Sequence, residues 1–297
     1  MSKPPMSKPP MSKPPMSWQT TRFLIPLQRP QVMGIVNVTP DSFSDGGQHG
    51  DADAARRHCE RLLYEGADIL DIGGESTRPA SRQPDIAQEL ARVLPVLRHA
   101  VTLGVPVSVD TSRPEVMQAA LDLGVDIVND VRALRRPGAL AMVAAHANCG
   151  VCLMHMQGEP ATMQCSPTYA GDGVAEVQAW LRQRLAEVQA AGVALQRITL
   201  DPGIGFGKSA VHNWALLQRQ AELLALGQPL LIGWSRKSTL GELTGRPVQD
   251  RLVASVAAAL ASVQRGARIL RVHDVAATVD ALKVWQMAGL VTGQASV

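Results

Sequence analysis

Acidic, amide and basic residues stand at the ends of short apolar runs in this sequence. The runs are rich in Val, Ile and Leu, and each polar residue closes a run or follows it within a few positions. These residues are Asp110, Asn129, Asp201, Lys237, Arg271 and His273. Buried carboxylates and amides bind the edge of a flat heterocycle, and cationic groups bind phosphate or carboxylate. The sequence therefore predicts a pocket for a planar ring that carries an anion.

The acidic and amide residues also have a structural explanation. An aspartate or asparagine after a strand commonly caps the next helix by accepting a hydrogen bond from its first N–H groups. For Asp110, Asn129 or Asp201 taken singly, capping and ligand binding compete on equal terms. Two carboxylates and an amide that converge in one cavity are costly without polar partners. The three residues together therefore favour ligand binding.

The basic residues surround a predicted anion site. The segment 231–238 (LIGWSRKS) runs from an apolar strand into a helix start at Ser238. Backbone N–H groups and the positive end of the helix dipole favour an anion there, and Lys237 adds a fixed charge. Alternation along a strand sends Arg271 and His273 to the same side. Solvated surface charge is the alternative explanation, and this grouping argues against it.

Eight short apolar segments alternate with longer helical segments along the chain. The predicted strands are 32–38, 68–73, 105–110, 126–129, 151–155, 198–201, 230–233 and 267–272. The predicted helices lie near 51–65, 85–103, 114–123, 138–147, 172–191, 210–226, 248–265 and 274–288. Nearly continuous apolar strands indicate a parallel sheet buried on both faces. Eight such units predict an α/β fold, a (β/α)8 TIM barrel, whose chemistry takes place at the C-terminal strand ends.

An open, doubly wound sheet shows the same alternation but places a glycine-rich phosphate loop after its first strand. The first predicted strand is instead followed by 37–41 (NVTPD). A glycine-rich segment, 203–209 (GIGFGKS), follows the sixth strand, and Pro202 stands where an ATP-binding loop needs its first glycine. We expect these glycines to turn the chain sharply over the barrel mouth and to bring Phe206 against a ligand.

Two other polar positions have competing explanations. In the loop 37–47, Asn37 and Asp45 carry oxygen atoms of the kind that Mg²⁺ accepts beside a diphosphate, and Phe43 would form an apolar lid. An ordinary loop explains that composition equally well. His155 follows a predicted strand, where a hydrogen-bonded structural histidine is the alternative to a substrate contact.

Composition limits the class of protein. The chain has 297 residues, 46% of them hydrophobic and 19% charged, which is enough for a large core. The net charge of +3 comes from three lysines in the first sixteen residues, so nothing indicates a nucleic-acid partner or a membrane surface. Residues 1–17 repeat MSKPP and are predicted to be a disordered tail, and residues 18–297 to form the barrel. No signal peptide or membrane span is predicted, and the cytoplasm is the expected location.

The four cysteines do not form a recognisable framework. Cys149 and Cys152 have the CxxC spacing of redox and zinc sites, but no second pair completes a zinc set. Cys152 continues into an apolar strand. We therefore expect both cysteines to be small core residues.

Four segments closely resemble those of bacterial dihydropteroate synthases. They are 33–47 (MGIVNVTPDSFSDGG), 71–79 (DIGGESTRP), 201–208 (DPGIGFGK) and 235–238 (SRKS). The resemblance runs from about residue 31 to residue 288. It implies a transferase of the folate pathway that joins 6-hydroxymethyl-7,8-dihydropterin diphosphate to 4-aminobenzoate, giving 7,8-dihydropteroate and diphosphate.

The resemblance also implies roles for individual residues. The pterin would be held by Asp110, Asn129, Met154, Asp201, Phe206, Lys237 and Arg271. The diphosphate would be held by Asn37, Thr77, Arg78, Arg271 and His273, with Mg²⁺ on Asn37 and Asp45. The 4-aminobenzoate pocket would consist of Phe43, Thr77, Pro79, Lys237 and Ser238. Of these, Asp110, Asp201, Lys237 and Arg271 would be the catalytic residues.

Two other readings remain open at this point. One is a pterin-binding barrel of the methyltetrahydrofolate–corrinoid methyltransferase type, which has no use for a diphosphate lid. The other is a non-catalytic pterin-binding protein. The resemblance further implies a homodimer formed through the outer helices. Trp234 is bulkier than the resembling family usually carries there, and we expect it to face away from the pocket.

Overall fold

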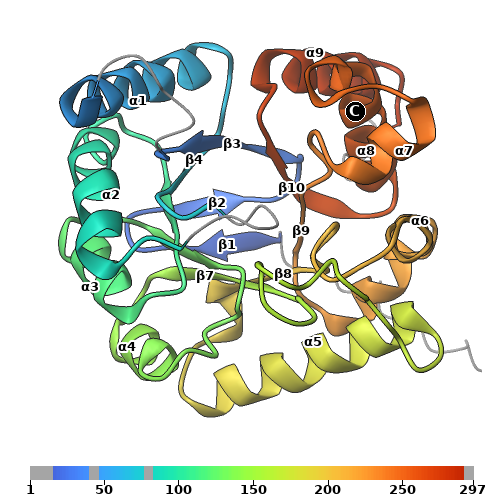
Figure 1. Cartoon of the computed structure of the whole chain (residues 1–297), viewed down its shortest axis with the longest axis horizontal. Helices are drawn as coiled ribbons and strands as arrows, with labels where there is room; N and C mark the ends of the chain where they lie inside the picture. The colour runs from blue at the N-terminus through green and yellow to red at the C-terminus, as the bar shows by residue number, and fades with distance from the viewer. Residues whose placement is uncertain (1–15, 40–46, 77–82, 291–297) are drawn as a thin grey trace, which may run out of the picture.

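A closed barrel of eight parallel strands forms the centre of the computed structural model, which describes residues 16–39, 47–76 and 83–290 (Figure 1). The strands pair in chain order, and the last closes onto the first. They are β3 (Gln31–Asn37), β4 (Ile69–Gly73), β5 (Val107–Asp110), β6 (Ile127–Asp130), β7 (Gly150–Met154), β8 (Ile198–Asp201), β9 (Leu230–Ile232) and β10 (Ala267–Val272). This confirms the predicted TIM barrel.

Helices surround the barrel as the crossover connections between its strands (Figure 1). The α-helices are α1 (Gly47–Tyr64), α2 (Ile86–Ala100), α3 (Pro114–Asp122), α4 (Ala139–Ala145), α5 (Gly173–Ala190), α6 (Ala210–Gln218), α7 (Ser238–Thr244), α8 (Leu252–Gln264) and α9 (Val275–Met287). Short 3₁₀ turns are η2 (Leu195–Arg197), η3 (Gln220–Leu226) and η4 (Val248–Asp250). Within the described residues, no helix is long and apolar enough to span a membrane.

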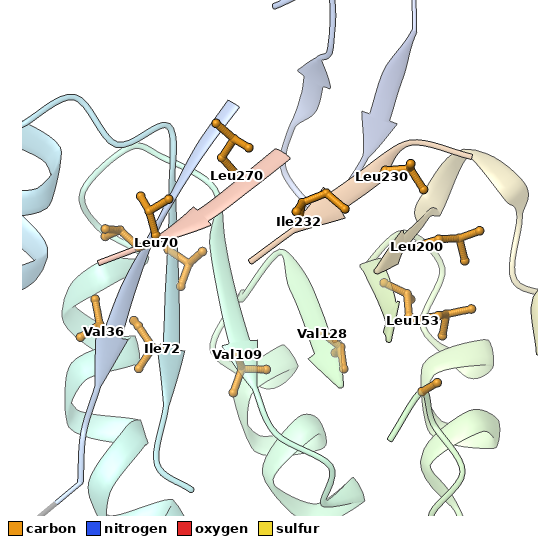
Figure 2. Packing of buried hydrophobic residues seen from close by; sticks show 14 of the residues in the cluster. Val36, Leu70, Ile72, Val109, Val128, Leu153, Leu200, Leu230, Ile232 and Leu270 are labelled. Carbon is orange, nitrogen blue, oxygen red and sulfur yellow. The ribbon is translucent and has the colours of Figure 1, made fainter. Parts of the chain in front are cut away.

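Alternation along the strands divides the apolar side chains into two layers. Val36, Ile72, Val109 and Leu153 point outward and pack with the helices, which Figure 2 shows for these and neighbouring strand residues. Their intervening neighbours point into the barrel. Burying apolar surface is the main stabilising contribution to folding. This outer layer therefore stabilises the strands, and their C-terminal ends can carry polar residues.

A two-stranded antiparallel sheet, β1 (Ser17–Gln19) with β2 (Leu24–Pro26), precedes the barrel. Trp18 is fully buried and packs with barrel residues such as Met33 and Ile127, and its indole N–H donates to the Arg197 carbonyl at 2.8 Å. These contacts lie at the N-terminal ends of the strands, so this sheet plugs the end opposite the polar one. This sheet was not among the predicted elements.

Most predicted bounds differ from the observed ones by a few residues, and three differences change the description of an element. The tail was expected to reach residue 17, but Ser17 pairs with Pro26 in β1. The helix expected near 210–226 is α6 followed by η3, with Arg219 between them, and the helix expected near 248–265 starts only at Leu252. Sequence patterns locate the ends of elements only to within a few residues, and they do not separate an α-helix from a 3₁₀ turn that follows it.

Candidate active site

Polar side chains from four strands meet at the C-terminal end of the barrel. Asp110 and Asp201 are the last residues of β5 and β8, and Asn129 and Arg271 are the next-to-last residues of β6 and β10. Asp110 lies in register with Asn129, which makes them neighbours across the sheet. Gly73 lies in register with Asp110 on the other side, and a Cβ there would come within 3.2 Å of the Asp110 Cβ. The predicted convergence at the mouth is confirmed.

Arg271 connects the fully buried carboxylate of Asp71 to the partly exposed carboxylate of Asp110. Its Nε donates to Asp71 Oδ2 at 2.6 Å, and its Nη2 donates to Asp110 Oδ2 at 2.6 Å. Asn129 Nδ2 also donates to Asp71 Oδ2, at 3.2 Å. Hydrogen bonds to two carboxylates fix the plane of the guanidinium. Asp71 therefore orients two residues of the predicted pterin site at once.

Asp71 was not among the predicted site residues. It stands in the middle of β4 among Ile69, Leu70 and Ile72, and it is fully buried. An acid inside an apolar strand was the available signal, because such a residue must find partners to be buried. The residue was overlooked because it does not stand at a strand end.

Burial controls the protonation of the acidic and basic residues at the mouth. Desolvation raises the pKa of Asp201 to about 6, against the opposing effect of the Gly203 N–H and of Lys237. Desolvation also lowers the pKa of Lys237 to about 8, while Asp201 opposes this shift. For Asp110, burial raises the pKa and the bridge to Arg271 acts in the opposite direction. These groups titrate near neutrality, as groups at functional sites commonly do.

The glycine-rich loop after β8 turns over the mouth as predicted. Gly203, Gly205 and Gly207 have φ angles of 70°, 78° and 61°, which side-chain-bearing residues rarely adopt. Phe206 packs beside Met154 in a small apolar cluster with Val131, Met156 and Met163. The loop thus places an aromatic ring beside Met154, at the C-terminal end of β7.

Lys237 lies against that ring. Its Nζ is 4.1 Å from the centre of the Phe206 ring, a cation–π contact. The preceding residue, Arg236, has a φ of 60°, and its guanidinium pairs with Asp274 at 2.6 Å. The left-handed turn ends where α7 starts, at the exposed Ser238. The predicted helix start is confirmed, although α7 was missing from the expected helices.

His273 is a neutral hydrogen-bonding residue beside the mouth. Burial, followed by the nearby Arg236 and Arg271, lowers its pKa to about 3. The backbone N–H of His273 donates to Ser235 Oγ at 3.1 Å, and that hydroxyl lies 3.0 Å from Nδ1. This arrangement favours Nδ1 as the acceptor and leaves the proton on Nε2. His273 therefore offers an N–H donor rather than a full positive charge.

His155 and Lys208 form a buried pair behind the glycine-rich loop. Lys208 Nζ lies 2.9 Å from His155 Nδ1, and burial lowers the pKa of the histidine to about 2. The imidazole stacks edge-on against Trp180 at 5.0 Å. Of the two alternatives for His155, these contacts favour the hydrogen-bonded structural histidine. Its partner is Lys208, a residue of the glycine-rich segment that does not match an ATP-binding loop.

Three residues singled out in the sequence lie in the core. Cys149 and Cys152 are both buried free thiols, one in the outer layer and one inside the barrel. Trp234 packs in the outer layer, where its ring stacks on Trp214 at 5.1 Å. The expectations of small core cysteines and of a tryptophan that faces away from the pocket are confirmed.

Part of the predicted site falls outside the described residues. Asn37 ends β3 in register with Gly73 and is half-buried. The described residues contain no group of three His, Cys, Asp or Glu that would hold a metal ion. The site residues outside the described ranges are Phe43, Asp45, Thr77, Arg78 and Pro79.

The fold and the site together define a β/α-barrel enzyme with a pocket for a planar, hydrogen-bonding ring. A family model described as "Pterin binding enzyme" matches residues 33–273. A dihydropteroate synthase of Neisseria meningitidis serogroup B is 57% identical over 92% of this chain and 98% of its own length. The chain belongs to the dihydropteroate synthase family of pterin-binding enzymes.

Solved structures agree with this assignment. A Xanthomonas albilineans dihydropteroate synthase with 4-aminobenzoic acid superposes with a TM-score of 0.86 at 50% identity, covering 92% of this chain and 98% of its own. A Burkholderia cenocepacia dihydropteroate synthase complexed with 7,8-dihydropteroate gives a TM-score of 0.83 at 47% identity, covering 93% and 97%.

Proposed function

We propose that the barrel mouth condenses 6-hydroxymethyl-7,8-dihydropterin diphosphate with 4-aminobenzoate to give 7,8-dihydropteroate and diphosphate. The observation that carries this proposal is the convergence of two carboxylates, an amide and two cations at one end of the barrel. Relatives of half-identical sequence and the same fold hold 4-aminobenzoic acid or 7,8-dihydropteroate. The chain is accordingly a transferase.

The pterin edge is the proposed partner of Asp110, Asn129, Asp201 and Lys237. Ring N–H groups donate to carboxylate oxygens, and ring acceptors take hydrogen bonds from the amide and the ammonium. One Asp201 oxygen accepts from Gly203 N–H at 2.7 Å, and the other serves the ring. Met154 and Phe206 contribute the apolar contact to the ring face, with Arg271 on the opposite face.

The diphosphate is the proposed partner of Arg271 and His273. Arg271 carries the charge, and His273 donates through Nε2 because it is neutral. Thr77 and Arg78 complete this subsite in the proposal, together with Asn37 at the end of β3. The developing negative charge of the leaving group is stabilised by donors that are already in position.

Mg²⁺ is the proposed metal. The Asn37 amide oxygen is of the hard type that this ion prefers, and Asp45 adds a carboxylate. One or two protein oxygens suit Mg²⁺, because substrate phosphates and water supply its other ligands. When bound, the ion would neutralise charge on the diphosphate.

The 4-aminobenzoate subsite is proposed around Lys237 and the exposed Ser238 at the start of α7. The carboxylate of 4-aminobenzoate accepts hydrogen bonds from the N–H groups of that helix start. Phe43, Thr77 and Pro79 supply the remaining walls in the proposal.

The proposed reaction breaks one bond before it forms the other. The C–O bond of the pterin methylene breaks, its electron pair leaves with the diphosphate, and the remaining carbocation is stabilised by Asp110 and Asp201. The amine nitrogen of 4-aminobenzoate then attacks that carbon and loses a proton. No covalent enzyme intermediate is required, so the side chains act by positioning and by charge.

Diphosphate release measured with and without 4-aminobenzoate tests the proposal. We expect release that depends on the amine and yields 7,8-dihydropteroate. A corrinoid methyltransferase would instead move a methyl group to cobalt and release no diphosphate. A non-catalytic pterin-binding protein would bind the pterin and release nothing.

We also propose that the protein is a homodimer located in the cytoplasm. Apolar side chains are exposed along α7, η4 and the start of α8, namely Leu243, Val248, Leu252 and Val253. Exposed apolar surface of this kind marks association sites. The four free thiols suit a reducing compartment.

A further inference from the structure

Lys208 lies directly behind the pocket, and the reaction described above gives it no role. Its side chain is 3% exposed. Its Nζ donates to the carbonyls of Gly203 at 2.9 Å and Phe206 at 3.0 Å, and it lies 2.9 Å from His155 Nδ1. The His155 carbonyl also accepts from Nζ, at 3.4 Å. Acceptors on all sides favour the protonated form of this ammonium group even though burial lowers the Lys208 pKa to about 7.

The contacts of Lys208 fix the loop that carries Phe206. Glycine is required at 203, because a Cβ there would lie 1.9 Å from the His155 carbonyl oxygen. A segment with this many glycines is intrinsically mobile. Lys208 ties both ends of the turn from Gly203 to Phe206, and Gln164 donates to the Gly205 carbonyl at 2.6 Å. The turn is therefore held from behind by one buried cation.

Lys208 also acts on the charges in front of the loop. Its charge, with that of Lys237, lowers the pKa of Asp201 against the effect of burial, and Arg271 acts in the same sense. The Cys152 thiol is a further titratable group near Asp201. Burial raises the pKa of this thiol well above its usual value, and the Asp201 charge acts in the same direction. Removing Lys208 takes away one of the three cations that keep Asp201 ionised.

We propose that Lys208 is a positioning residue for pterin binding, which holds the loop that carries Phe206 in place beside Asp201. The proposal rests on the function given above. It differs from a purely structural role in that the two residues Lys208 affects, Phe206 and Asp201, are both assigned to the pterin. The 4-aminobenzoate half depends on Ser238 and the loop before it, and that loop is held by hydrogen bonds with Ser255 and Arg251 instead.

The test compares Lys208→Met with the wild type in steady-state kinetics for both substrates. We expect kcat/KM for the pterin diphosphate to fall by about tenfold or more, with KM for 4-aminobenzoate nearly unchanged. The acidic limb of the kcat/KM profile should move to higher pH, because Asp201 loses a neighbouring cation. Lys283→Met, on an exposed lysine of α9, is the matched control and should behave as the wild type.

The outcomes are distinguishable. The proposal is overturned if the wild type is active and Lys208→Met has the same kcat/KM for the pterin diphosphate. It is also overturned if the acidic limb of the Lys208→Met profile does not move. An inactive wild type overturns the proposed function instead. If Lys208→Met does not fold, Lys208→Gln keeps donors for the loop carbonyls without the charge, and it should still shift the limb. Failure of both variants to fold would assign Lys208 to folding alone and overturn the proposal.

Discussion

Arg271 is the residue on which the geometry of the mouth depends most directly. It holds Asp71 and Asp110 at 2.6 Å each, and Asn129 shares the same Asp71 oxygen. A ring that hydrogen-bonds to Asp110 must share that carboxylate with the guanidinium or displace it. Arg271 therefore links binding of the ring to handling of the diphosphate.

Replacing Arg271 by lysine should lower kcat/KM by at least about 100-fold, and alanine should abolish turnover. A lysine carries the charge but has no planar fork with which to reach two carboxylates at once. Steady-state assays with Arg182→Lys, an exposed residue of α5, provide the control. Near-wild-type activity in Arg271→Lys would show that charge alone suffices.

Asp201 should set the acidic limb of the pH profile. Desolvation raises its pKa to about 6, above the usual value of 3.8, so the folded protein takes up this proton as the pH falls through about 6. Since the ring requires an ionised carboxylate, kcat/KM for the pterin should decrease below that pH. Asp201→Asn should lose most activity and this limb with it. A limb that persists unchanged in Asp201→Asn would belong to another group.

At the scale of elements, the glycine-rich loop after β8 is the part whose backbone the function constrains most. Gly203 combines a φ of 70° with a close approach to the His155 carbonyl, whereas Gly104 has a φ of 78° and open space around it. The two glycines thus separate the cost of the backbone angle from the cost of the clash.

Gly203→Ala should therefore reduce both stability and activity, and Gly104→Ala only stability. The angle alone costs about 1 kcal/mol in either variant, and displacement of the loop adds to this at Gly203. Urea unfolding and turnover measured on both variants check the expectation. Equal effects of the two substitutions on turnover would mean that the loop tolerates movement.

The barrel strands could be predicted because their apolar runs recur along the chain and are separated by segments of helical periodicity. The β1–β2 sheet could not, since its two strands of three residues each stand outside that strand–helix repeat. Of helix α7, which has seven residues from Ser238 to Thr244, only the start was predicted. Such short elements are stabilised by tertiary packing rather than by their own sequence pattern.

The site could be predicted where a polar residue closes an apolar strand, as Asp110 and Asp201 do. Asp71 and Lys208 do not follow that rule. Asp71 lies inside a strand, and Lys208 approaches from behind a loop. The roles of Asp71 and Lys208 depend on which groups the fold brings beside them. Residue spacing along the sequence does not reveal such contacts.

At the scale of the whole molecule, the exposed apolar surface on α7, η4 and α8 predicts association of two copies. Val253 is 80% exposed, and a charge there would have to be desolvated in an interface. We expect Val253→Glu to shift the protein from dimer to monomer in sedimentation experiments. Val211→Glu, on the similarly exposed Val211 of α6, should leave the mass unchanged. A monomeric wild type would contradict the proposed dimer.

The central claim is that one pocket at the C-terminal end of the barrel holds both halves of the product. A crystal structure of this chain with 7,8-dihydropteroate tests it most directly. We predict the pterin ring within hydrogen-bond distance of Asp110, Asn129 and Asp201, with the benzoate end directed toward Ser238. A product bound elsewhere, or a pterin ring without contact to these carboxylates, would contradict the account.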